Sequence, residues 1–347
     1  MLAVVKTKSG PGNVELLEVQ EPAVGADSVK IEVKYAGICG TDLHIYHDSY
    51  KSNPPVILGH EFSGIVVEAG ERVTRLKVGD RVTALPSTAV TCGSCEHCRT
   101  GNYMFCTERK SLGSGVNGAF TKYVAAREDM VYRIPDHLSL EEAALTEPLA
   151  CAVKAIEELT PIHIGDTVLL SGPGPIGLIC LSLLAMKGCK IIVAGTTADA
   201  SRLTIAKELG ADVIVNVSEE DLHEVVGRET GGKGVDVAVE CAGAGPSVAS
   251  CLREVKKRGK YIQVGIVGKE IAIDYDVILY KQLQVVASYA HSIETWDRVM
   301  NIWNQNKIRL QPVITYKLPI RRWKEAFEIC ERKIGGKVLL SYDDSPE

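Results

Sequence analysis

The amino-acid sequence predicts an α/β protein of two domains, in which a mainly-β domain is interrupted by a doubly wound parallel sheet. A chain of 347 residues is long for a single hydrophobic core and comfortable for two domains. Up to about residue 147 the chain reads as short strands and turns, whereas from about residue 148 brief apolar strands alternate with helical runs. Alternation of this kind is typical of a parallel sheet that is covered by helices.

The first, mainly-β part has one clear strand followed by glycine turns. Residues 29–36 alternate apolar and polar side chains, which is the period of a half-buried strand. Glycines punctuate the chain that follows, and residues 78–82 read as a turn that leads into a strand. We therefore expect short strands with tight connections in this part of the chain.

The second part carries the strands of the predicted parallel sheet, separated by helical runs such as residues 200–209. We expect these strands at residues 168–170, 191–193, 213–215, 235–239, 261–264 and 283–287. After about residue 289, amphipathic helical segments at 293–303 and 322–329 return to a less regular pattern. The predicted boundaries are residues 1–150 and 290–347 for the split first domain, and residues 151–289 for the parallel-sheet domain.

Composition and charge exclude several classes of partner. The formal net charge is -5 and no run of Lys and Arg occurs, so we expect neither a nucleic-acid partner nor a membrane partner. No stretch of about 18 apolar residues is present, and the amino terminus lacks the basic-then-apolar order of a signal peptide. The sequence thus predicts a soluble, cytoplasmic protein.

Four of the eleven cysteines lie close together in the sequence, and their spacing is C-x2-C-x2-C-x7-C. This spacing suits one tetrahedral zinc ion that is held by four thiolates. All four coordination positions would be filled, so this zinc would hold a loop and do no chemistry. Nucleic-acid zinc ribbons usually separate two C-x-x-C pairs by about 15–20 residues, which differs from this pattern. The predicted ligands of the structural zinc are Cys92, Cys95, Cys98 and Cys106.

A second set of possible zinc ligands follows the predicted strand at residues 29–36. Cys39 comes first, and His60 and Glu61 come later in the chain. Cysteine, histidine and carboxylate together suit zinc, and three protein ligands plus water form the open arrangement of a catalytic site. Adjacent side chains on a strand point to opposite faces, so His60 and Glu61 can share a metal only on irregular backbone, which Gly59 makes plausible.

The start of the second part offers two further ligands for the same metal. Glu147, next to Pro148 at the domain boundary, is a second candidate carboxylate. Cys151 is a competing thiolate, unless it is one of the small, reduced core residues that the scattered cysteines most simply are. The sequence leaves the choice between Glu61 and Glu147 open.

A glycine-rich loop lies directly after the strand at residues 168–170 and opens an apolar helix. Its G-x-G-x-x-G pattern permits a tight turn and close approach of the backbone to a ligand, and the helix amino terminus offers N–H groups to a pyrophosphate. The pattern is weak evidence alone but strong between a strand and a helix. The predicted cofactor-binding residues of this loop are Gly172, Gly174, Pro175, Ile176 and Gly177.

The end of the next strand predicts which nicotinamide cofactor binds. Proteins that bind NAD carry an acidic residue there for the ribose 2′-hydroxyl. Here Gly195, Thr196 and Thr197 follow the strand, with Arg202 nearby, and this group would accommodate a 2′-phosphate. We therefore expect NADP rather than NAD, with Asp199 as the residue that would serve NAD if the loop folds back.

Taken together, these motifs resemble the zinc-containing medium-chain dehydrogenase/reductase superfamily over nearly the whole chain. The resemblance is strongest to its sorbitol (polyol) dehydrogenase and threonine dehydrogenase branch. It implies a GroES-like catalytic domain and a Rossmann domain, with the active site in the cleft between them. The motifs that carry it are residues 36–44, 59–61 and 147–149, the four-cysteine loop, the glycine loop at 172–177 and residues 236–241.

The resemblance also implies roles for the ligand candidates. Cys39 and His60 would bind the catalytic zinc, Glu61 would complete the set, and Glu147 would bind the zinc directly or through its water. Alcohol dehydrogenases of the family carry a cysteine where this chain has Glu147, so the glutamate favours a polyol-type site. Two zinc ions per chain are therefore expected, one catalytic and one structural.

The implied reaction is zinc-assisted hydride transfer from an alcohol to NAD(P). Zinc would act as a Lewis acid that lowers the pKa of the bound alcohol, and the hydride would pass to the nicotinamide. Thr41 would accept the alcohol proton and pass it through the cofactor ribose to His44 at the surface, although His44 is alternatively a solvated loop residue.

The substrate that the resemblance implies is a sugar alcohol or vicinal diol, with threonine or a simple secondary alcohol as alternatives. His291 stands roughly where sorbitol dehydrogenases have an arginine that touches the polyol. Two other functions are a zinc-independent-type reductase of enones or quinones and a catalytically silent zinc protein. Family members are commonly dimers or tetramers, so we expect a homo-oligomer.

Overall fold

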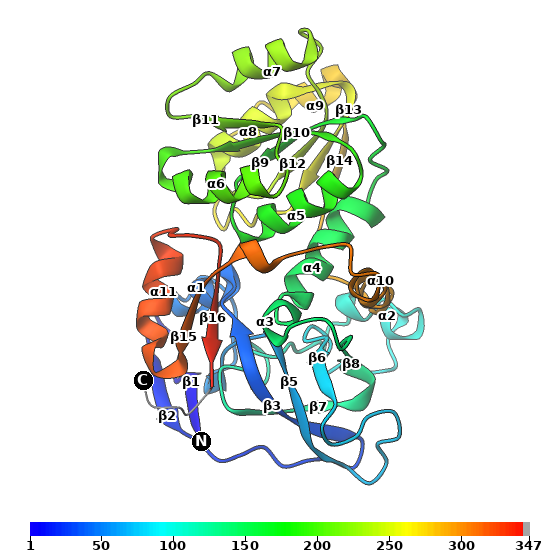
Figure 1. Ribbon diagram of the computed structural model, residues 1–347, viewed down its shortest axis with the longest axis vertical. Coiled ribbons are helices and arrows are strands. Elements are labelled where there is room, and N and C mark those ends of the chain that lie inside the picture. Colours follow the sequence, from blue (N-terminus) through cyan, green and yellow to red (C-terminus); the bar gives the residue numbers. More distant parts are fainter. Residues whose placement is uncertain (343–347) are drawn as a thin grey trace.

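Two sheets lie at opposite ends of the long axis of the molecule, and helices pack on and between them (Figure 1). This computed structural model describes residues 1–342. The lower sheet in Figure 1 is mixed and has seven strands, and the upper sheet has six parallel strands. None of the helices in the described residues is both long enough and apolar enough to span a bilayer.

The mixed sheet is built around β3 (Ser28–Gly37), which confirms the strand that the alternating side chains predict. β3 pairs with β5 (Glu61–Ala69) and β7 (Tyr123–Arg127). The other strands are β6 (Arg81–Ala84), β8 (Val131–Arg133), β15 (Ile314–Pro319) and β16 (Lys337–Ser341). A separate three-stranded sheet holds β1 (Leu2–Lys6), β2 (Val14–Glu18) and β4 (Val56–Ile57).

The last strand of the chain, β16, pairs antiparallel with β3 near the start of the chain. Helix α11 (Trp323–Glu331) packs against β16, and both lie with the lower sheet in Figure 1. The sequence predicts the helix, because its apolar residues recur at helical spacing, but not the two strands on either side of it. The pairing places Lys337, the first residue of β16, at the end of β3 where Cys39 follows.

The parallel sheet has the order β11-β10-β9-β12-β13-β14, and the connection reverses direction between β9 and β12. This is the order of a doubly wound dinucleotide-binding sheet, in which ligands bind at the reversal point. All six predicted strands are confirmed. They are β9 (Thr167–Ser171), β10 (Lys190–Gly195), β11 (Val213–Asn216), β12 (Val235–Glu240), β13 (Val255–Gln263) and β14 (Gln284–Ala287).

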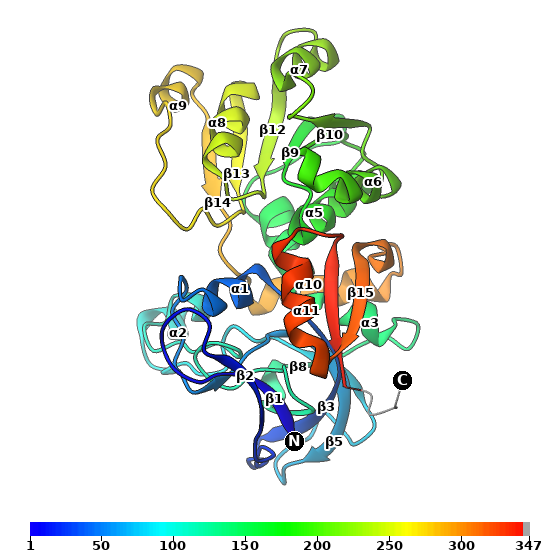
Figure 2. The same cartoon turned by 90° about the vertical axis from the view of Figure 1, so that its left-hand side faces the viewer.

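Helices cover both faces of the parallel sheet, as Figure 2 shows. One face packs against α5 (Pro175–Met186) and α6 (Ala200–Glu208), and the other against α8 (Gly245–Glu254) and α9 (Asp276–Lys281), with α7 (Leu222–Thr230) beside α8. Helix α5 is apolar on nearly all sides because it lies between the sheet and α4 (Thr146–Val153).

Helix α4 lies at the junction of the two sheets, because it contacts both α5 and β5. It continues as a turn of π-helix at Lys154–Glu158 and packs on α10 (Ile293–Asn304), whose Trp296 and Trp303 are fully buried. This packing holds Glu147, in the first turn of α4, between the two sheets. The remaining helices are α1 (Gly40–Tyr46), α2 (Glu96–Arg99) and α3 (Leu140–Ala143).

Candidate metal centres and cofactor site

Cys39 occupies the turn that leads from β3 into α1, where it is the N-cap of the helix. The Asp42 carboxylate accepts a hydrogen bond of 2.9 Å from the Cys39 backbone N–H, and this capping box fixes the turn. A residue at the N-cap has extended backbone and presents its side chain beyond the helix end, where the helix dipole favours a negative charge. The turn therefore presents the Cys39 side chain at the start of α1, and Thr41 Oγ1 lies 3.6 Å from its sulfur.

His60 and Glu61 reach the same point as Cys39 because the backbone turns sharply at Gly59. Gly59 has a φ of 88°, and a side chain there would overlap the ring of Phe120. Ligand atoms of Cys39, His60 and Glu61 all lie within 4.8 Å of one another. The irregular backbone that the sequence requires for a shared metal is thus present, and the donor set of sulfur, imidazole and carboxylate fits zinc.

The Asp42 side chain contacts both Cys39 and His60. Its carboxylate is fully buried, accepts a hydrogen bond from the Gly59 N–H at 3.3 Å, and lies 3.7 Å from His60 Nδ1. Burial lowers the pKa of the His60 imidazole, but Asp42 and Cys39 outweigh it and raise that pKa well above its ordinary value. A carboxylate on one ring nitrogen orients a histidine for metal binding through the other nitrogen.

Glu61 is buried, with 1% of its surface exposed, and forms an ion pair with Lys337 from β16. Lys337 Nζ lies 2.8 and 2.6 Å from the two carboxylate oxygens and also donates to the Ile38 carbonyl at 3.1 Å. Although burial lowers the pKa of Lys337, the Glu61 charge raises it above its ordinary value. Gly37 is required nearby because a Cβ there would overlap the Glu61 carboxylate.

Glu147 faces a second group of ligand atoms, those of Cys151 and His291, and the three lie within 4.8 Å of one another. Trp296 Nε1 donates to His291 Nδ1 at 2.8 Å, so Nδ1 must carry no proton. The proton of the neutral ring is therefore on Nε2, which donates to Glu147 Oε1 at 3.1 Å. Burial raises the pKa of Glu147, but this bond and nearby positive charge outweigh it and lower the pKa to about 2.

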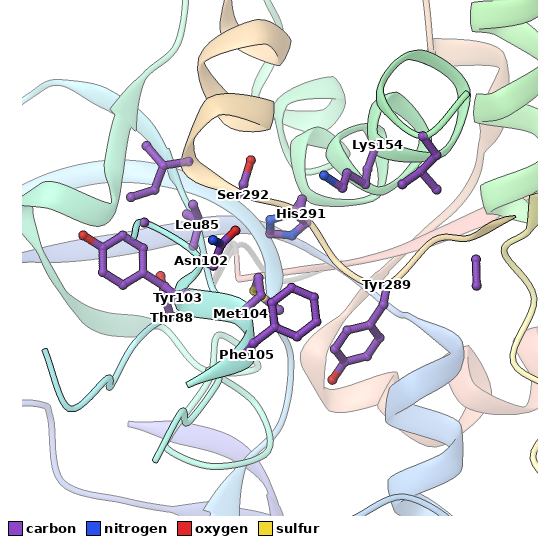
Figure 3. A pocket seen from close by; sticks show the side chains of 14 residues that line it. Leu85, Thr88, Asn102, Tyr103, Met104, Phe105, Lys154, Tyr289, His291 and Ser292 are labelled. Carbon is purple, nitrogen blue, oxygen red and sulfur yellow. The ribbon is translucent and has the colours of Figure 1, made fainter. Parts of the chain in front are cut away.

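His291 is 1% exposed and lines a cavity of about 250 Å³ beside the candidate metal site. Figure 3 shows it between Ser292 and Met104, with Tyr289 on the side away from Ser292. It lies in the wall of this cavity, and both of its ring nitrogens bond to protein groups. In this structure the imidazole therefore orients Glu147. The rest of the cavity wall comes from Leu85, Thr88, residues 101–105, Lys154, Leu159, Ala287 and Ile293.

The four clustered cysteines come together in one loop, with their sulfurs within 4.8 Å of one another. Backbone N–H groups point at three of these sulfurs: Cys92 N at Cys106 Sγ, Cys95 N at Cys92 Sγ and Cys98 N at Cys95 Sγ, at 3.3–3.4 Å. Hydrogen bonds from Ser94 and Cys95 lower the pKa of Cys92 to about 6. Four sulfurs fit one closed tetrahedral zinc site.

The glycine loop lies at the point where the parallel sheet reverses direction, between β9 and α5. Gly172 has a φ of 95°, and a side chain there would overlap Ala242. Gly174 caps α5, Pro175 begins the helix, and a side chain at Gly177 would overlap the Gly172 carbonyl. The loop therefore presents bare backbone and a helix amino terminus, which is the arrangement that binds a pyrophosphate.

The end of β10 differs from its predicted arrangement at Arg202. The Asp199 carboxylate accepts hydrogen bonds from the Thr196 N–H at 3.1 Å and the Thr196 hydroxyl at 2.8 Å. Arg202 is buried, with 7% of its surface exposed, and it donates to the Gly335 carbonyl at 2.6 Å and lies 3.4 Å from Asp199. The interpretation of Arg202 as a free cation for a 2′-phosphate is therefore corrected, because the guanidinium joins α6 to the loop before β16.

Comparison with known proteins assigns the fold and the family. Residues 25–136 match the family model of the alcohol dehydrogenase GroES-like domain, and residues 175–305 match that of the zinc-binding dehydrogenase. The chain belongs to the zinc-binding alcohol dehydrogenase family. The predicted combination of a GroES-like domain and a Rossmann domain is confirmed, and so is the prediction of a zinc-dependent enzyme that oxidises or forms alcohols.

Relatives in this family cover the whole length of the chain. A D-arabitol-phosphate dehydrogenase of Enterococcus avium is 39% identical over 100% of this chain and 98% of its own. A sorbitol dehydrogenase of Halalkalibacterium halodurans is 40% identical over 98% of this chain and 99% of its own.

Two solved structures superpose on the chain almost completely. A putative zinc-binding dehydrogenase from Sinorhizobium meliloti 1021, bound to NADP, has a TM-score of 0.89, is 30% identical and covers 98% of both chains. A dehydrogenase from E. coli CFT073, complexed with NADH, has a TM-score of 0.88, is 28% identical and covers 99% of both chains.

Three residues that the sequence analysis missed complete the candidate site: Asp42, Lys337 and Trp296. Asp42 lies inside the motif at residues 36–44, and an aspartate three residues after a turn signals a capping box, so its backbone contact was predictable. Lys337 and Trp296 carry no such signal, because each meets its partner only through packing between distant segments.

Proposed function

We propose that the protein oxidises a polyol, a vicinal diol or another secondary alcohol, with NADP or NAD as the hydride acceptor. The observation that carries this proposal is the group of Cys39, His60 and Glu61 beside a second group that contains Glu147. Glu147 is close enough for its charge to affect the pKa of His60 and of Glu61. A glutamate at position 147, where alcohol dehydrogenases carry cysteine, favours a polyol over a simple alcohol. The polyol named for each of the two relatives described above agrees with this substrate class.

Cys39 and His60 would hold one zinc ion, with Glu61 and Glu147 as the two candidate carboxylates. Glu61 belongs to the group of Cys39 and His60, and Glu147 belongs to a second group with Cys151 and His291. When bound, zinc supplies a Lewis acid that lowers the pKa of the alcohol. Both oxygens of Glu61 bond to Lys337, whereas Glu147 bonds to His291 through one oxygen. We infer that Glu147 is the carboxylate free to approach the metal or its water, and that the four-cysteine loop binds a second, structural zinc.

We propose that the Thr41 hydroxyl accepts the proton of the reacting alcohol. It lies in the first turn of α1, and its hydroxyl is 3.6 Å from the Cys39 sulfur. His44 lies one turn further along the same helix, where its Nδ1 is 3.1 Å from Ser49 Oγ. We assign the release of the proton to solvent to His44, because it is partly exposed.

Replacing Thr41 by valine tests both the reaction and this relay. Purified wild-type protein should reduce NADP or NAD with a polyol, and the Thr41→Val variant should lose about 100-fold in kcat, because general acid–base catalysis contributes about 10²–10⁴-fold. Thr41→Ser keeps a hydroxyl and should retain most of the activity. A Thr41→Val enzyme with the wild-type kcat would show that this hydroxyl does not transfer the proton.

We infer a preference for NADP from the end of β10. Among the described residues, the carboxylate nearest to this point in the chain is Asp199, which is buried and bonds to Thr196 and Arg202. Thr197 is exposed, and its hydroxyl is 3.0 Å from Asn216 Nδ2. Hydroxyl and amide donors on an exposed loop suit a 2′-phosphate, and neither Thr197 nor Asn216 would repel its charge.

Kinetics with the two cofactors will measure this preference. The wild-type protein should prefer NADP by at least about tenfold in kcat/KM. Thr197→Asp should remove that preference by charge repulsion, whereas Thr197→Asn is the neutral control of similar size and should keep it. An aspartate at position 195 would be a poorer test than Thr197→Asp, because a Cβ at Gly195 would lie only 3.0–3.1 Å from Pro173 and Leu203. Equal or better use of NAD by the wild type would contradict the proposal.

We also propose a homo-oligomer, either a dimer or a tetramer. Strand β14 lies at one edge of the parallel sheet, and its Val285 is exposed. An exposed apolar edge strand offers unpaired backbone groups to a second chain. Tyr275, Leu279 and Tyr280, on and next to α9, are further exposed apolar side chains close to it in the chain.

A further inference from the structure

Arg109, which follows the four-cysteine loop, carries a positive charge next to Tyr289 of the cavity wall. Its Nη1 donates to the Ser87 carbonyl at 3.1 Å and to Ser111 Oγ at 2.8 Å. Its Nη2 donates to the Tyr289 hydroxyl at 2.9 Å, and the guanidinium lies 5.9 Å from the centre of the Tyr289 ring. The side chain is thus held in one position by three neighbours, and it is only half-buried.

None of these partners neutralises the charge of Arg109. The three hydrogen bonds use three of the five N–H groups of the guanidinium. Within residues 1–342 no carboxylate forms an ion pair with Arg109. Arg72, by contrast, forms an ion pair with Asp27 at the surface. A fixed guanidinium with unused donors is suited to bind an anion.

Contacts through Ser87 place Arg109 next to the candidate metal site. The Ser87 carbonyl accepts from Arg109, while the Ser87 hydroxyl lies 3.4 Å from His291 Nε2, which bonds to Glu147. A substrate whose reacting hydroxyl lies at the metal site would therefore extend past His291 toward the guanidinium.

Two tyrosine hydroxyls accompany the charge. Burial raises the pKa of Tyr50, and the neighbours that affect this pKa are Tyr289, Arg109 and Cys39. Tyr50 is therefore near the Tyr289 hydroxyl, and the charges of Arg109 and Cys39 act on it. Tyr289 lines the cavity and lies beside Phe105 in Figure 3. The Arg109 guanidinium and the two tyrosine hydroxyls together offer more hydrogen-bond donors than a single neutral hydroxyl of a substrate could accept.

We propose that Arg109, with the hydroxyls of Tyr50 and Tyr289, binds a phosphate group at the far end of the substrate. This inference rests on the proposed function, because it names phosphorylated polyols as the substrate class of the same site. A planar guanidinium binds phosphate through parallel N–H···O bonds, and its positive charge discriminates against the neutral parent alcohol. Arg109 is therefore a specificity residue of the oxidation reaction.

Paired substrates test the proposal. We expect kcat/KM for a pentitol phosphate to exceed that for the corresponding pentitol by about 10- to 100-fold, which is the range of a charge-assisted hydrogen bond. Arg109→Leu should bring this ratio close to one, mainly through a higher KM for the phosphorylated substrate. Arg109→Lys keeps the charge without the planar donors and should retain part of the ratio.

Lys110→Met is the matched control, because it removes the same charge from the neighbouring, exposed residue. It should leave the ratio unchanged, and zinc content and Tm of Arg109→Leu should match the wild type. A second measurement needs no turnover: inorganic phosphate should raise the Tm of the wild-type protein more than that of Arg109→Leu, because the glycine loop that suits a pyrophosphate is unchanged in the variant.

Three outcomes would overturn the inference. A wild-type enzyme that oxidises neutral polyols at least as well as their phosphates refutes the phosphate site but leaves the proposed function intact. A preference for threonine over the pentitol phosphate would show that the anion is a carboxylate. If no alcohol is oxidised, the proposed function fails, and an equal Tm response of wild type and Arg109→Leu to phosphate then refutes the site as well.

Discussion

Cys39→Ser should abolish alcohol oxidation, with a loss in kcat/KM on the order of 10³ or more. Cys39 supplies the one thiolate in the group that also contains His60 and Glu61, and serine is a much poorer ligand for zinc. Loss of a Lewis acid that is worth several kcal/mol corresponds to a factor of this size. Steady-state kinetics with a polyol will measure the change.

Zinc analysis supplies the control for this variant. Wild-type protein should contain about two zinc ions per chain, and Cys39→Ser about one. Cys95→Ser should lose the other zinc, because Cys95 belongs to the four-cysteine loop, and it should lower the Tm since metal binding and local folding are coupled. Full activity of Cys39→Ser on an enone or quinone would instead indicate a zinc-independent-type reductase. One zinc per wild-type chain would contradict the two-site assignment.

Lys337→Met should cost about 3–5 kcal/mol of the free energy of unfolding, which is the usual effect of leaving a buried charge without its partner. Glu61 is 1% and Lys337 is 3% exposed, and both oxygens of the Glu61 carboxylate bond to Lys337. Methionine fills a similar volume but leaves the carboxylate without its counter-charge. Urea denaturation, read through two-state fits, will measure the difference.

A surface ion pair of the same type is the matched control. Lys317 on β15 pairs with Glu141 at 2.7 Å, but its side chain is 50% exposed, so Lys317→Met should cost less than about 1 kcal/mol. Adding Glu61→Gln to Lys337→Met should recover part of the loss, because the unpaired charge is then absent. Equal costs for Lys337→Met and Lys317→Met would show that the buried pair does not stabilise the fold.

Local pattern in the sequence determined a large part of the fold. The alternating side chains of residues 29–36 predict β3, because a strand half-buried on one face must alternate. The six short apolar runs predict the strands of the parallel sheet, and the glycine pattern predicts a pyrophosphate-binding loop between the first of these strands and a helix, where β9 and α5 lie. The four-cysteine loop was equally predictable, since all its ligands lie within one short segment. Each of these features depends on residues that are neighbours in the chain.

The tertiary structure decided the contacts that join distant segments. Whether His60 and Glu61 can share a metal depended on the backbone at Gly59, which the sequence only made plausible. The bond between His291 and Glu147 and the bond between Arg202 and Gly335 depend on how the two sheets are placed around α4.

The pairing of Lys337 with Glu61 shows why such contacts are not visible in the sequence. The two residues are 276 positions apart, and they meet because β3 pairs both with β16 and with β5. Periodicity reports which face of an element is buried but not which other element covers that face. The sequence by itself therefore determined β3, the strands of the parallel sheet, the two motif loops and the ligand types. It did not predict β15 or β16, and only the packing of β16, α4 and α10 decided which charge faces which ligand.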